Sequence, residues 1–590
     1  MRPRLLSTGP FVLGLLIVGF ESISKSAQLP ETTIVHEQDV AVPMRDGVRL
    51  RADILRPTRG RFPTLVYRTP YGKRAALKDY TTFTRAVERG YAVVVQDVRG
   101  RYASDGEFRP YENEGRDGYD TIEWAAQQPW STGRVGTFGL SYPGAVQWLA
   151  AVESPPHLEA MVPAMTFSTP QNFFYTWGIW DMSWIEWIWQ NIAADVRVKK
   201  NLPGPTKQDD VVASWNALKE KMRRTLPLDQ LAELRDVAPY YYDWLHHPPE
   251  DPFWNFAELR NKYGRTHAAV LNLSGWNDDN YGPEGATTNF DGLVRSRGGM
   301  PSRASLLLGP WVHGVGSTGK TTFGERDFGA AAAIDYDEVV LGWMDRYLRS
   351  DRSVTPPDAV RYFVMGENRW KTSSTWPPPG HADIYYLSSS GDAARRGGLT
   401  STPPMGSDVP STFVSNPDDP VINPYESAGP HDYKQLADRG DVLTFDSAPL
   451  ARDTEVTGPI RARVYISCDC RDTDLWVRLL DVAPDGAAYN LMSPGLDAVR
   501  ASYRNLDKGR QLLTPGRVYE LRLDHLVTSN LFQRGHRVRI QISATFFPNF
   551  SRNLNTGDSE TVSGRMRRAT IHVYHDRQHP SQVSLHVADR

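Results

Sequence analysis

The chain has 590 residues, too many for one ordinary domain, and its length predicts about two to four domains. Apolar residues make up 40% and charged residues 23%, which is close to an average globular protein and excludes a disordered or fibrous chain. The net charge is −2, from 67 basic and 69 acidic residues, so there is no electrostatic basis for binding nucleic acid or an anionic membrane surface. An excess of aromatic residues, with 17 Trp and 26 Tyr, indicates thick cores or aromatic-lined pockets for organic ligands.

The first residues have the pattern of a targeting signal. A basic start with Arg2 and Arg4 precedes an apolar run and then small residues. The run is about half of the roughly 20 residues that span a bilayer, so residues 1–27 are predicted to be a signal peptide cleaved near Ser26 or Ala27. An uncleaved N-terminal anchor is the alternative. We expect export to the periplasm or the medium, with no membrane association after cleavage.

Short apolar runs separated by helical stretches follow the signal. Residues 32–57 alternate around the turn Arg45-Asp46-Gly47, which predicts a hairpin at the edge of a sheet. The later runs are nearly continuous, which predicts a doubly wound, mainly parallel sheet covered on both faces. This catalytic domain is expected to comprise residues 28–166 and 266–350. Its expected strands are Thr64–Tyr67, Ala92–Val95, Val135–Phe138, Ala160–Pro163, Ala268–Leu273 and Ser305–Leu308.

Residues 167–265 interrupt this alternation and predict a helical cap inserted between two strands. The aromatic residues of Trp177–Trp189 recur along one helical face, so we expect one amphipathic helix there. A second helix is expected at Trp215–Arg224. Most of the cap tryptophans are expected to pack in the core, and a few to line a substrate pocket: Trp177, Trp180, Trp184, Trp187, Trp189, Trp215, Trp244 and Trp254.

Residues 351–590 are predicted to be a C-terminal jelly-roll domain with its connection. Many short β-type runs are separated by turn residues beyond residue 441, which is typical of an antiparallel sandwich. Residues 358–386 are expected to hold the first strands of this layer or the connection to it. Cys468 and Cys470 would share one face of a strand, which predicts packed thiols, with a strained disulfide as the alternative.

The sharpest motif is Gly139-Leu140-Ser141-Tyr142-Pro143-Gly144, which follows an expected strand and precedes a helical run. A serine in this context is typical of a nucleophile elbow, which exposes the Ser141 hydroxyl on a strained turn at a helix N-terminus. The backbone N–H of Tyr142 would then point at a developing oxyanion. Pro143 departs from the common Gly-x-Ser-x-Gly pattern.

A serine nucleophile needs a base, and the base needs an orienting acid. In this architecture both follow the serine at the ends of later strands, in the order Ser, Asp, His. The strand expected at 268–273 runs into Asp278, and the strand expected at 305–308 runs into His313. Each residue alone is weak evidence, but the ordered set predicts a catalytic triad with Ser141 as nucleophile.

These motifs resemble the cocaine esterase, glutaryl acylase and X-Pro dipeptidyl-peptidase group of α/β-hydrolases, the CocE/NonD type. The resemblance covers nearly the whole mature chain. Besides the elbow, it rests on Arg68–Tyr71, Asp97–Gly100 with Ser104–Gly106, Gly275–Asp278, Gly309–His313, Gly535–Arg537 and Phe547–Asn553. Within the family the elbow is Gly-x-Ser-Tyr-x-Gly, to which Pro143 conforms. The resemblance implies an α/β-hydrolase domain, an inserted helical cap and a C-terminal jelly roll.

The resemblance also implies a residue that the motifs alone do not reveal. In the cocaine esterase branch, the tyrosine of the Arg-x-Pro-Tyr segment donates its hydroxyl to the oxyanion, and this position is Tyr71. We expect double displacement, in which His313 deprotonates Ser141 while Asp278 orients the imidazole. Tyr142 N–H and Tyr71 O–H hold the oxyanion, and no metal or cofactor is required. Three polar residues beside the site are expected to form a structural turn with ion pairs: Asp97, Arg99 and Asp105.

The expected substrate is a neutral, partly apolar acyl group held under an aromatic cap and released from an ester. The α-amino acid ester hydrolases of the family bind the substrate ammonium with acids after the catalytic Asp and early in the cap. The positions after the catalytic Asp are here Asn280 and Tyr281, so that carboxylate cluster is expected to be absent. The cap position falls near Phe174 and Tyr175. Two other acids could take its place: Asp181 and Glu186.

Three alternatives stay open. Within enzymes, they are an amide-cleaving acylase, for example on β-lactam side chains, or a dipeptidyl-peptidase, although the Pro-specific peptidases carry extra domains for which this chain has no room. Outside enzymes, a jelly roll on an inactive hydrolase would be a carbohydrate-binding protein, which the presence of all three triad residues argues against. The expected partner is a small acyl ester or amide and not a nucleic acid. Assembly into a homo-oligomer is left open.

Overall fold

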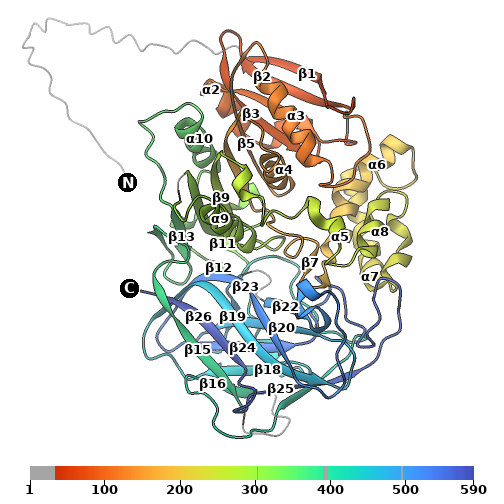
Figure 1. The fold of residues 1–590 in the computed structure, drawn as a ribbon, viewed down its shortest axis with the longest axis vertical. Helices are drawn as coiled ribbons and strands as arrows, with labels where there is room; N and C mark the ends of the chain where they lie inside the picture. The colour runs from red at the N-terminus through yellow and green to blue at the C-terminus, as the bar shows by residue number, and fades with distance from the viewer. Residues whose placement is uncertain (1–33, 302, 390–395, 493–495, 590) are drawn as a thin grey trace, which may run out of the picture.

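The computed structural model describes residues 34–301, 303–389, 396–492 and 496–589. The predicted signal peptide lies outside these ranges. Figure 1 shows an α/β body in red to green above an all-β body in cyan and blue, with the cap helices in yellow along one side. The predicted fold class, an α/β-hydrolase sheet with a cap and a C-terminal β domain, is confirmed.

A ten-stranded sheet forms the α/β body, in the order β1-β2-β4-β3-β5-β6-β9-β10-β13-β14. The strands from β4 to β13 run parallel, and antiparallel pairs occur only near the two edges among the described strands. The predicted edge hairpin is β1–β2, and all six predicted parallel strands are present. The bounds are β1 Ile34–Pro43, β2 Arg49–Pro57, β3 Phe62–Thr69, β4 Ala92–Asp97, β5 Ser131–Leu140, β6 Leu158–Ala164, β9 Ala269–Asn277, β10 Ala304–Val312, β13 Val360–Val364 and β14 Arg369–Ser373.

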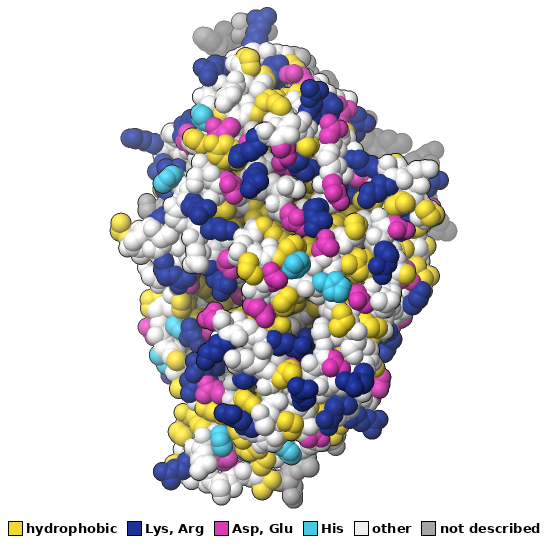
Figure 2. All heavy atoms as spheres, turned by 45° about the vertical axis from the view of Figure 1, so that its right-hand side comes forward, with side chains coloured by type: hydrophobic (Ala, Val, Ile, Leu, Met, Phe, Trp, Pro, Cys, Tyr) yellow, Lys and Arg dark blue, Asp and Glu magenta, His cyan; other side chains and the backbone are white. Residues whose placement is uncertain are grey.

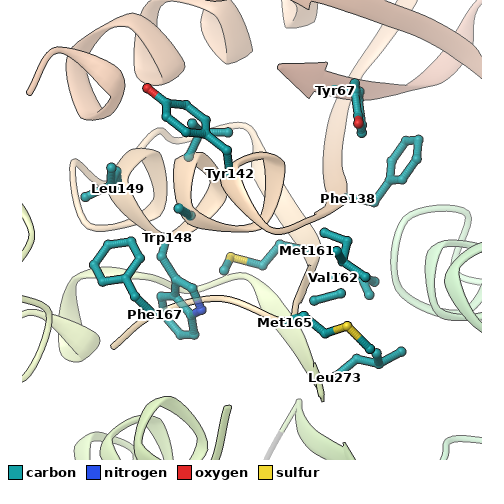
Figure 3. Packing of buried hydrophobic residues seen from close by; sticks show 14 of the residues in the cluster. Tyr67, Phe138, Tyr142, Trp148, Leu149, Met161, Val162, Met165, Phe167 and Leu273 are labelled. Atoms are coloured by element: carbon teal, nitrogen blue, oxygen red, sulfur yellow. The ribbon is translucent and has the colours of Figure 1, made fainter. Parts of the chain in front are cut away.

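Helices cover both faces of this sheet, and α4 is the most enclosed of them. All ten residues of α4 are buried, because the helix packs against the sheet, against α3 and against aromatic side chains of the cap region. Figure 3 shows side chains of α4, β6 and the segment after β6 filling one continuous core. Trp148 of this helix is fully buried, and burying a large apolar side chain stabilises a fold by about 1.5–3 kcal/mol. The helices are α1 Lys73–Asp79, α2 Thr82–Glu88, α3 Glu114–Ala126, α4 Tyr142–Ala151, α9 Glu284–Ser296 and α10 Tyr336–Tyr347.

The segment between β6 and β9 forms the cap, and its first part differs from the prediction. The expected helix Trp177–Trp189 begins only at Ser183, because residues 175–180 form the hairpin β7 Tyr175–Thr176 and β8 Ile179–Trp180. Gly178 turns this hairpin with φ 84°, a conformation that interrupts a helix. The expected helix at Trp215–Arg224 is present within α7. The other cap elements are α5 Ser183–Trp187, the π-helix Ile188–Ile192, α6 Ala193–Lys200, α7 Gln208–Arg224 and α8 Pro239–His246.

A twelve-stranded assembly makes up the C-terminal β domain. The sequence predicts that residues 358–386 hold the first strands of this layer or the connection to it. Only β15 (Gly380–Ser388) joins the layer, because β13 and β14 extend the first sheet, where β13 lies parallel to β10 after the crossover helix α10. The strands are β15 Gly380–Ser388, β16 Arg396–Thr400, β17 Ser411–Ser415, β18 Leu443–Ser447, β19 Thr454–Cys468, β20 Asp474–Val482, β21 Ala488–Asn490, β22 Leu496–Arg500, β23 Tyr519–Phe532, β24 Arg537–Ser543, β25 Ala569–Tyr574 and β26 Gln582–Ala588.

The two cysteines form a disulfide, so the prediction of packed thiols is wrong. Strand β19 ends at Cys468, and the chain bends at Asp469. The two side chains therefore do not keep the parallel orientation that a continuous strand would give. The Cα atoms of Cys468 and Cys470 are 5.2 Å apart, within the range that a disulfide spans.

The surface agrees with the balanced charge of the sequence. Figure 2 shows Lys and Arg side chains interspersed with Asp and Glu over one whole face, without a large area of one sign. Across the described ranges, no helix has both the length and the apolar character needed to cross a membrane.

The turn at Gly178 provides a test of how the cap contacts the β domain. A Cβ at this position would lie 2.4 Å from Tyr503 Cδ2, so Gly178→Ala adds a clash to the strain of a positive φ. We expect it to lower the free energy of unfolding by about 2–4 kcal/mol, measured by urea denaturation. Gly298→Ala is the matched control, because Gly298 also has a positive φ but no atom within 4 Å of its Cβ position. Equal losses in the two variants would contradict the close packing at Gly178.

Candidate active site

Ser141 lies on a strained turn between β5 and α4. Its backbone has φ 68° and ψ −127°, outside the ordinary regions for a non-glycine residue. Its N–H donates to Ala164 O at 3.0 Å, and its own carbonyl accepts from Gly144 N at 2.8 Å. A side chain at Gly144 would lie 2.6 Å from Ala164 O, which explains the glycine there. The predicted elbow is therefore present as a geometry.

Asp278 and His313 follow the neighbouring strands β9 and β10 and meet at the same edge of the sheet. His313 Nδ1 and Asp278 Oδ1 are 2.9 Å apart, and Asp278 is fully buried. The same carboxylate oxygen accepts from Asn280 N at 3.0 Å, which fixes the acid. Because Nδ1 faces the acid, Nε2 is the imidazole nitrogen left to exchange a proton with a nucleophile.

Burial lowers the pKa of His313, but the charge and hydrogen bond of Asp278, together with the charge of Asp279, outweigh this and raise it above its ordinary value. The side chain of His313 stays 18% exposed, so it can reach a substrate and water. A raised pKa stabilises the imidazolium, which is the state a general base reaches after it takes a proton.

Tyr71 lies just past the end of β3. Its hydroxyl oxygen accepts the indole N–H of Trp187 with an N–O distance of 3.0 Å. Burial raises the pKa of Tyr71 to about 12, although the side chains of Trp187 and Ser141, which are close enough to act on it, lower it in part. The phenol is therefore protonated at neutral pH and can serve as a hydrogen-bond donor.

Tyr142 is the first residue of α4, and its backbone N–H is one of the helix N-terminal groups without a partner inside the helix. Its side chain is locked from two sides, because its hydroxyl donates to Glu114 Oε1 at 2.8 Å and accepts from Tyr111 N at 3.1 Å. Its ring stacks on the Tyr111 ring with a centroid distance of 4.2 Å. The start of α4 is thus held at a fixed angle to Ser141.

A buried ion pair between Arg68 and Glu114 holds the Tyr142 hydroxyl in place. Arg68 Nη2 and Glu114 Oε2 are 2.8 Å apart, and both side chains are at most 4% exposed. Arg68 also donates to Gln96 Oε1 at 2.8 Å. Burial raises the pKa of Glu114, and the nearby Arg68 charge and the Tyr142 hydroxyl oppose that rise. Removing one partner of such a pair leaves an unpaired buried charge, which typically costs about 3–5 kcal/mol.

Aromatic side chains surround the space beside Ser141. Tyr281 lies three residues after Asp278; burial raises the pKa of its hydroxyl, and the nearby side chains of Ser141 and Tyr111 oppose that rise. Its ring lies 5.7 Å from the His313 ring and stacks on Phe173 at 5.5 Å. Sequence reasoning treated Tyr281 only as a missing acid; its place three residues after Asp278 was the signal that could have found it.

The other polar residues singled out in the sequence divide into two groups. Asp97 accepts Lys73 N at 2.7 Å, and Arg99 pairs with Asp117 at 2.6 Å, so they form the expected structural cluster. Gly100 N donates to Asp105 O in the same turn. In the cap, burial raises the pKa of Asp181 to about 6, with the charge of Asp279 adding to the rise.

The other cap positions singled out in the sequence are engaged in packing, hydrogen-bond or ion-pair contacts. Phe174 is fully buried and stacks on Trp184, and the Tyr175 hydroxyl donates to His247 O. Glu186 pairs with Arg223 at 2.9 Å. Within the described ranges, no cluster of three or more His, Cys, Asp or Glu side chains could hold a metal ion.

Comparisons with known proteins divide the chain in the same way. Residues 46–315 match the model of X-Pro dipeptidyl-peptidase (S15 family), and residues 353–584 match that of the X-Pro dipeptidyl-peptidase C-terminal non-catalytic domain. Cocaine esterase of Rhodococcus sp. (strain MB1 Bresler) is 33% identical over 577 residues, which cover 94% of this chain and 98% of that protein.

Two solved structures show a similar fold. An aminopeptidase from a marine sediment archaeon, Thaumarchaeota archaeon, aligns with a TM-score of 0.79 at 22% identity over 96% of this chain and 100% of its own. An α-amino acid ester hydrolase aligns with a TM-score of 0.78 at 22% identity, with the same coverage of both chains. At this level of identity the two structures bear on the fold alone.

The titration of His313 should respond to the charge of Asp279. Asp279→Asn removes a carboxylate that raises the pKa of His313, so the imidazole should lose its proton at a lower pH than in the parent. The measurement is an NMR titration of ring-labelled histidine, with the His313 signal assigned by its loss in His313→Asn. Asp438→Asn is the control, because Asp438 is 78% exposed on the β domain. An unchanged or higher pKa in Asp279→Asn would contradict this arrangement of charges.

Proposed function

Because the chain belongs to the hydrolase family of the X-Pro dipeptidyl-peptidases (S15) and cocaine esterase, we propose that it is an exported serine hydrolase that cleaves carboxylic esters through an acyl-enzyme intermediate. The observation that carries this proposal is the 2.9 Å contact between His313 Nδ1 and Asp278 Oδ1, at the same edge of the parallel sheet as the strained Ser141. A nucleophile, a base and an orienting acid are the groups that acyl transfer needs.

Acylation begins when Ser141 Oγ attacks the ester carbonyl carbon. His313 takes the hydroxyl proton, and Asp278 stabilises the imidazolium that forms. The carbonyl oxygen becomes an oxyanion held by Tyr142 N–H and the Tyr71 hydroxyl. The tetrahedral intermediate collapses, His313 returns the proton to the leaving alkoxide, and the alcohol departs. A water deprotonated by His313 then attacks the acyl-enzyme and releases the acid and Ser141.

The aromatic surroundings support a partly apolar acyl group. Phe173 and Tyr281 form a stacked pair beside Ser141, and Trp184 lies edge-on to Phe173 at 5.0 Å. Flat rings of this kind bind apolar and aromatic groups through contact area and edge-to-face geometry. The Tyr281 hydroxyl adds one polar group to this wall.

A neutral acyl group is favoured over an α-amino one by the residues at four positions. The α-amino acid ester hydrolases of the family bind the substrate ammonium with acids, whereas the corresponding positions two and three residues after Asp278 and early in the cap are here Asn280, Tyr281, Phe174 and Tyr175. An ester has a better leaving group than an amide, because an alkoxide departs more readily than an amide nitrogen.

One observation favours a second candidate function, hydrolysis of substrates with an α-amino group. Asp279 lies directly after the triad acid, and its charge acts on both His313 and Asp181. Two carboxylates near the nucleophile could pair with a substrate ammonium. The candidate thus covers amino acid esters, amides and peptides.

Export is part of the proposal and rests on the N-terminal sequence pattern. The Cys468–Cys470 disulfide supports it, because disulfides persist in the periplasm and outside the cell and are rare in a reducing cytosol.

The proposed mechanism predicts that removal of the Ser141 hydroxyl greatly lowers kcat/KM. Ser141→Ala should reduce kcat/KM on aryl esters at least about a thousandfold, while circular dichroism and melting temperature stay those of the parent. Initial rates on matched aryl esters and aryl anilides of the same acids give the ester-to-amide ratio. We expect esters to be cleaved faster by at least about a hundredfold. A Ser141→Ala variant as active as the parent would contradict the assignment of Ser141 as the nucleophile of the triad.

A second experiment distinguishes a neutral acyl substrate from a substrate with an α-amino group. At about pH 8, above the acid limb of His313, a phenylacetate ester and the matching phenylglycine ester should differ in kcat/KM by less than about threefold. Asp279→Asn should leave this ratio unchanged. A preference of more than about tenfold for the amino ester that disappears in Asp279→Asn would replace the neutral acyl group by an ammonium-bearing substrate.

A further inference from the structure

A hydrogen bond joins the cap to the loop that carries Tyr71. Trp187 Nε1–H donates to the Tyr71 hydroxyl oxygen at 3.0 Å, across 116 positions of sequence. Trp187 is the last residue of the short helix α5, and Tyr71 follows β3 of the catalytic sheet. The contact therefore couples a residue outside the catalytic sheet to a group beside Ser141.

We propose that Trp187 is a positioning residue that orients and polarises the Tyr71 hydroxyl toward the oxyanion formed on Ser141 attack. The inference rests on the proposed function, in which Tyr71 donates to that oxyanion, and adds the residue that prepares it for this role.

The direction of the hydrogen bonds carries the argument. The indole N–H of a tryptophan is a donor only, whereas a phenol has one proton and can also accept. Because the Tyr71 oxygen accepts from Trp187, its single proton is not used in that bond and is left for another acceptor, and the Ser141 side chain is close enough to act on the same hydroxyl. A chain of bonds that runs in one direction also polarises each member, so the second bond is strengthened by the first.

Trp187 is held in place by stacking. Its ring is parallel to the Tyr142 ring, with 6.1 Å between centroids and an angle of 5°, and the Trp184 ring meets it edge-on at 5.2 Å. The ring of Tyr142, whose backbone N–H is the other expected oxyanion donor, thus packs against the side chain that binds Tyr71. One aromatic stack therefore relates the two donors to each other.

A single buried guanidinium fixes the backbones on both sides of this bond. Arg101 is fully buried; its Nε donates to Pro70 O at 2.8 Å, directly before Tyr71. Its Nη1 donates to Ile192 O at 3.0 Å and its Nη2 to Asn191 O at 3.1 Å, in the π-helix that follows Trp187. Short π-helices are frequent at functional sites, because the wider turn shifts the side chains beside it.

A tryptophan that only lined the substrate pocket would behave differently when replaced. Its loss would change substrate binding, and hence KM, and the change would be the same whether or not Tyr71 kept its hydroxyl. A positioning residue that acts through Tyr71 changes kcat and loses its effect once that hydroxyl is gone.

The test is a double-mutant cycle on an aryl ester with Trp187→Phe, Tyr71→Phe and the double variant, beside Ser141→Ala. Trp187→Phe keeps an aromatic ring and removes the N–H, and we expect kcat to fall about tenfold with KM within about twofold. In Tyr71→Phe we expect kcat to fall about a hundred- to a thousandfold, and the double variant should have the same kcat as Tyr71→Phe. Trp189→Phe is the control, since its indole N–H donates to Ser214 Oγ and it should keep the parent rate.

Each other outcome overturns the proposal. An unchanged kcat in Trp187→Phe, a change in KM alone, or a double variant about tenfold below Tyr71→Phe would show that Trp187 does not act through Tyr71. A fully active Tyr71→Phe would remove the oxyanion role of Tyr71 and this inference with it, while an inactive Ser141→Ala in the same assay would leave the serine mechanism intact. If Trp187→Phe melts more than about 5 °C below the parent, benzothienylalanine at position 187 replaces the N–H by sulfur in the same ring shape and gives the same comparison.

Discussion

The left-handed backbone at Ser141 is the constraint on which the rest of the site depends. A non-glycine residue at φ 68° and ψ −127° is strained by about 1–3 kcal/mol and keeps this conformation only where its surroundings determine it. Here β5 leads into the turn and the fully buried helix α4 leads out of it. Gly139 and Gly144 make this possible, because a Cβ at either would lie 2.6 Å from Pro143 Cβ or Ala164 O. The dense core around α4 therefore fixes the position of Ser141, the proposed nucleophile.

The buried polar groups next to Tyr142 also help to fix the position of Ser141. A buried pair such as Arg68 and Glu114 contributes little net stability, because the loss of hydration offsets the attraction between the charges. Its hydrogen bonds, however, have direction. Glu114 receives the Tyr142 hydroxyl, and so the pair determines where the first turn of α4 begins relative to Ser141. This explains why two charges lie in an otherwise apolar core.

The sequence predicted those parts of the site that follow strand ends. Ser141, Asp278 and His313 each come directly after a buried parallel strand, and parallel strands bring such residues to one edge of a sheet. Whether the three residues act as a triad is still a prediction. The position of Trp187 could not be derived, because the helical spacing of the cap aromatics did not reveal the hairpin at 175–180.

That hairpin depends on contacts distant in sequence, and the other errors have the same origin. Gly178 turns against Tyr503, which lies more than 300 residues away, and local spacing carries no signal of this contact. Strands β13 and β14 join the first sheet because β13 pairs with β10, although their composition resembles that of the domain after them. The bend at Asp469 that allows the disulfide is likewise invisible to a pattern that continues a strand by alternation.

The C-terminal domain contributes none of the proposed triad residues, yet it bears on the geometry of the site through the cap. Met182 N donates to Asn549 O at 2.9 Å, and Ser551 N donates to Trp180 O at 2.9 Å, so the chain entering α5 is bonded to a loop of the β domain. Helix α5 spans about 7.5 Å and continues without a break into the π-helix Ile188–Ile192 and α6, so it is the first part of a longer helical run. The bonds to the β domain hold the start of this run, and Trp187, which binds Tyr71, lies about one helical turn after Ser183. The β domain, the cap and the catalytic sheet therefore jointly determine where the hydroxyl beside Ser141 lies.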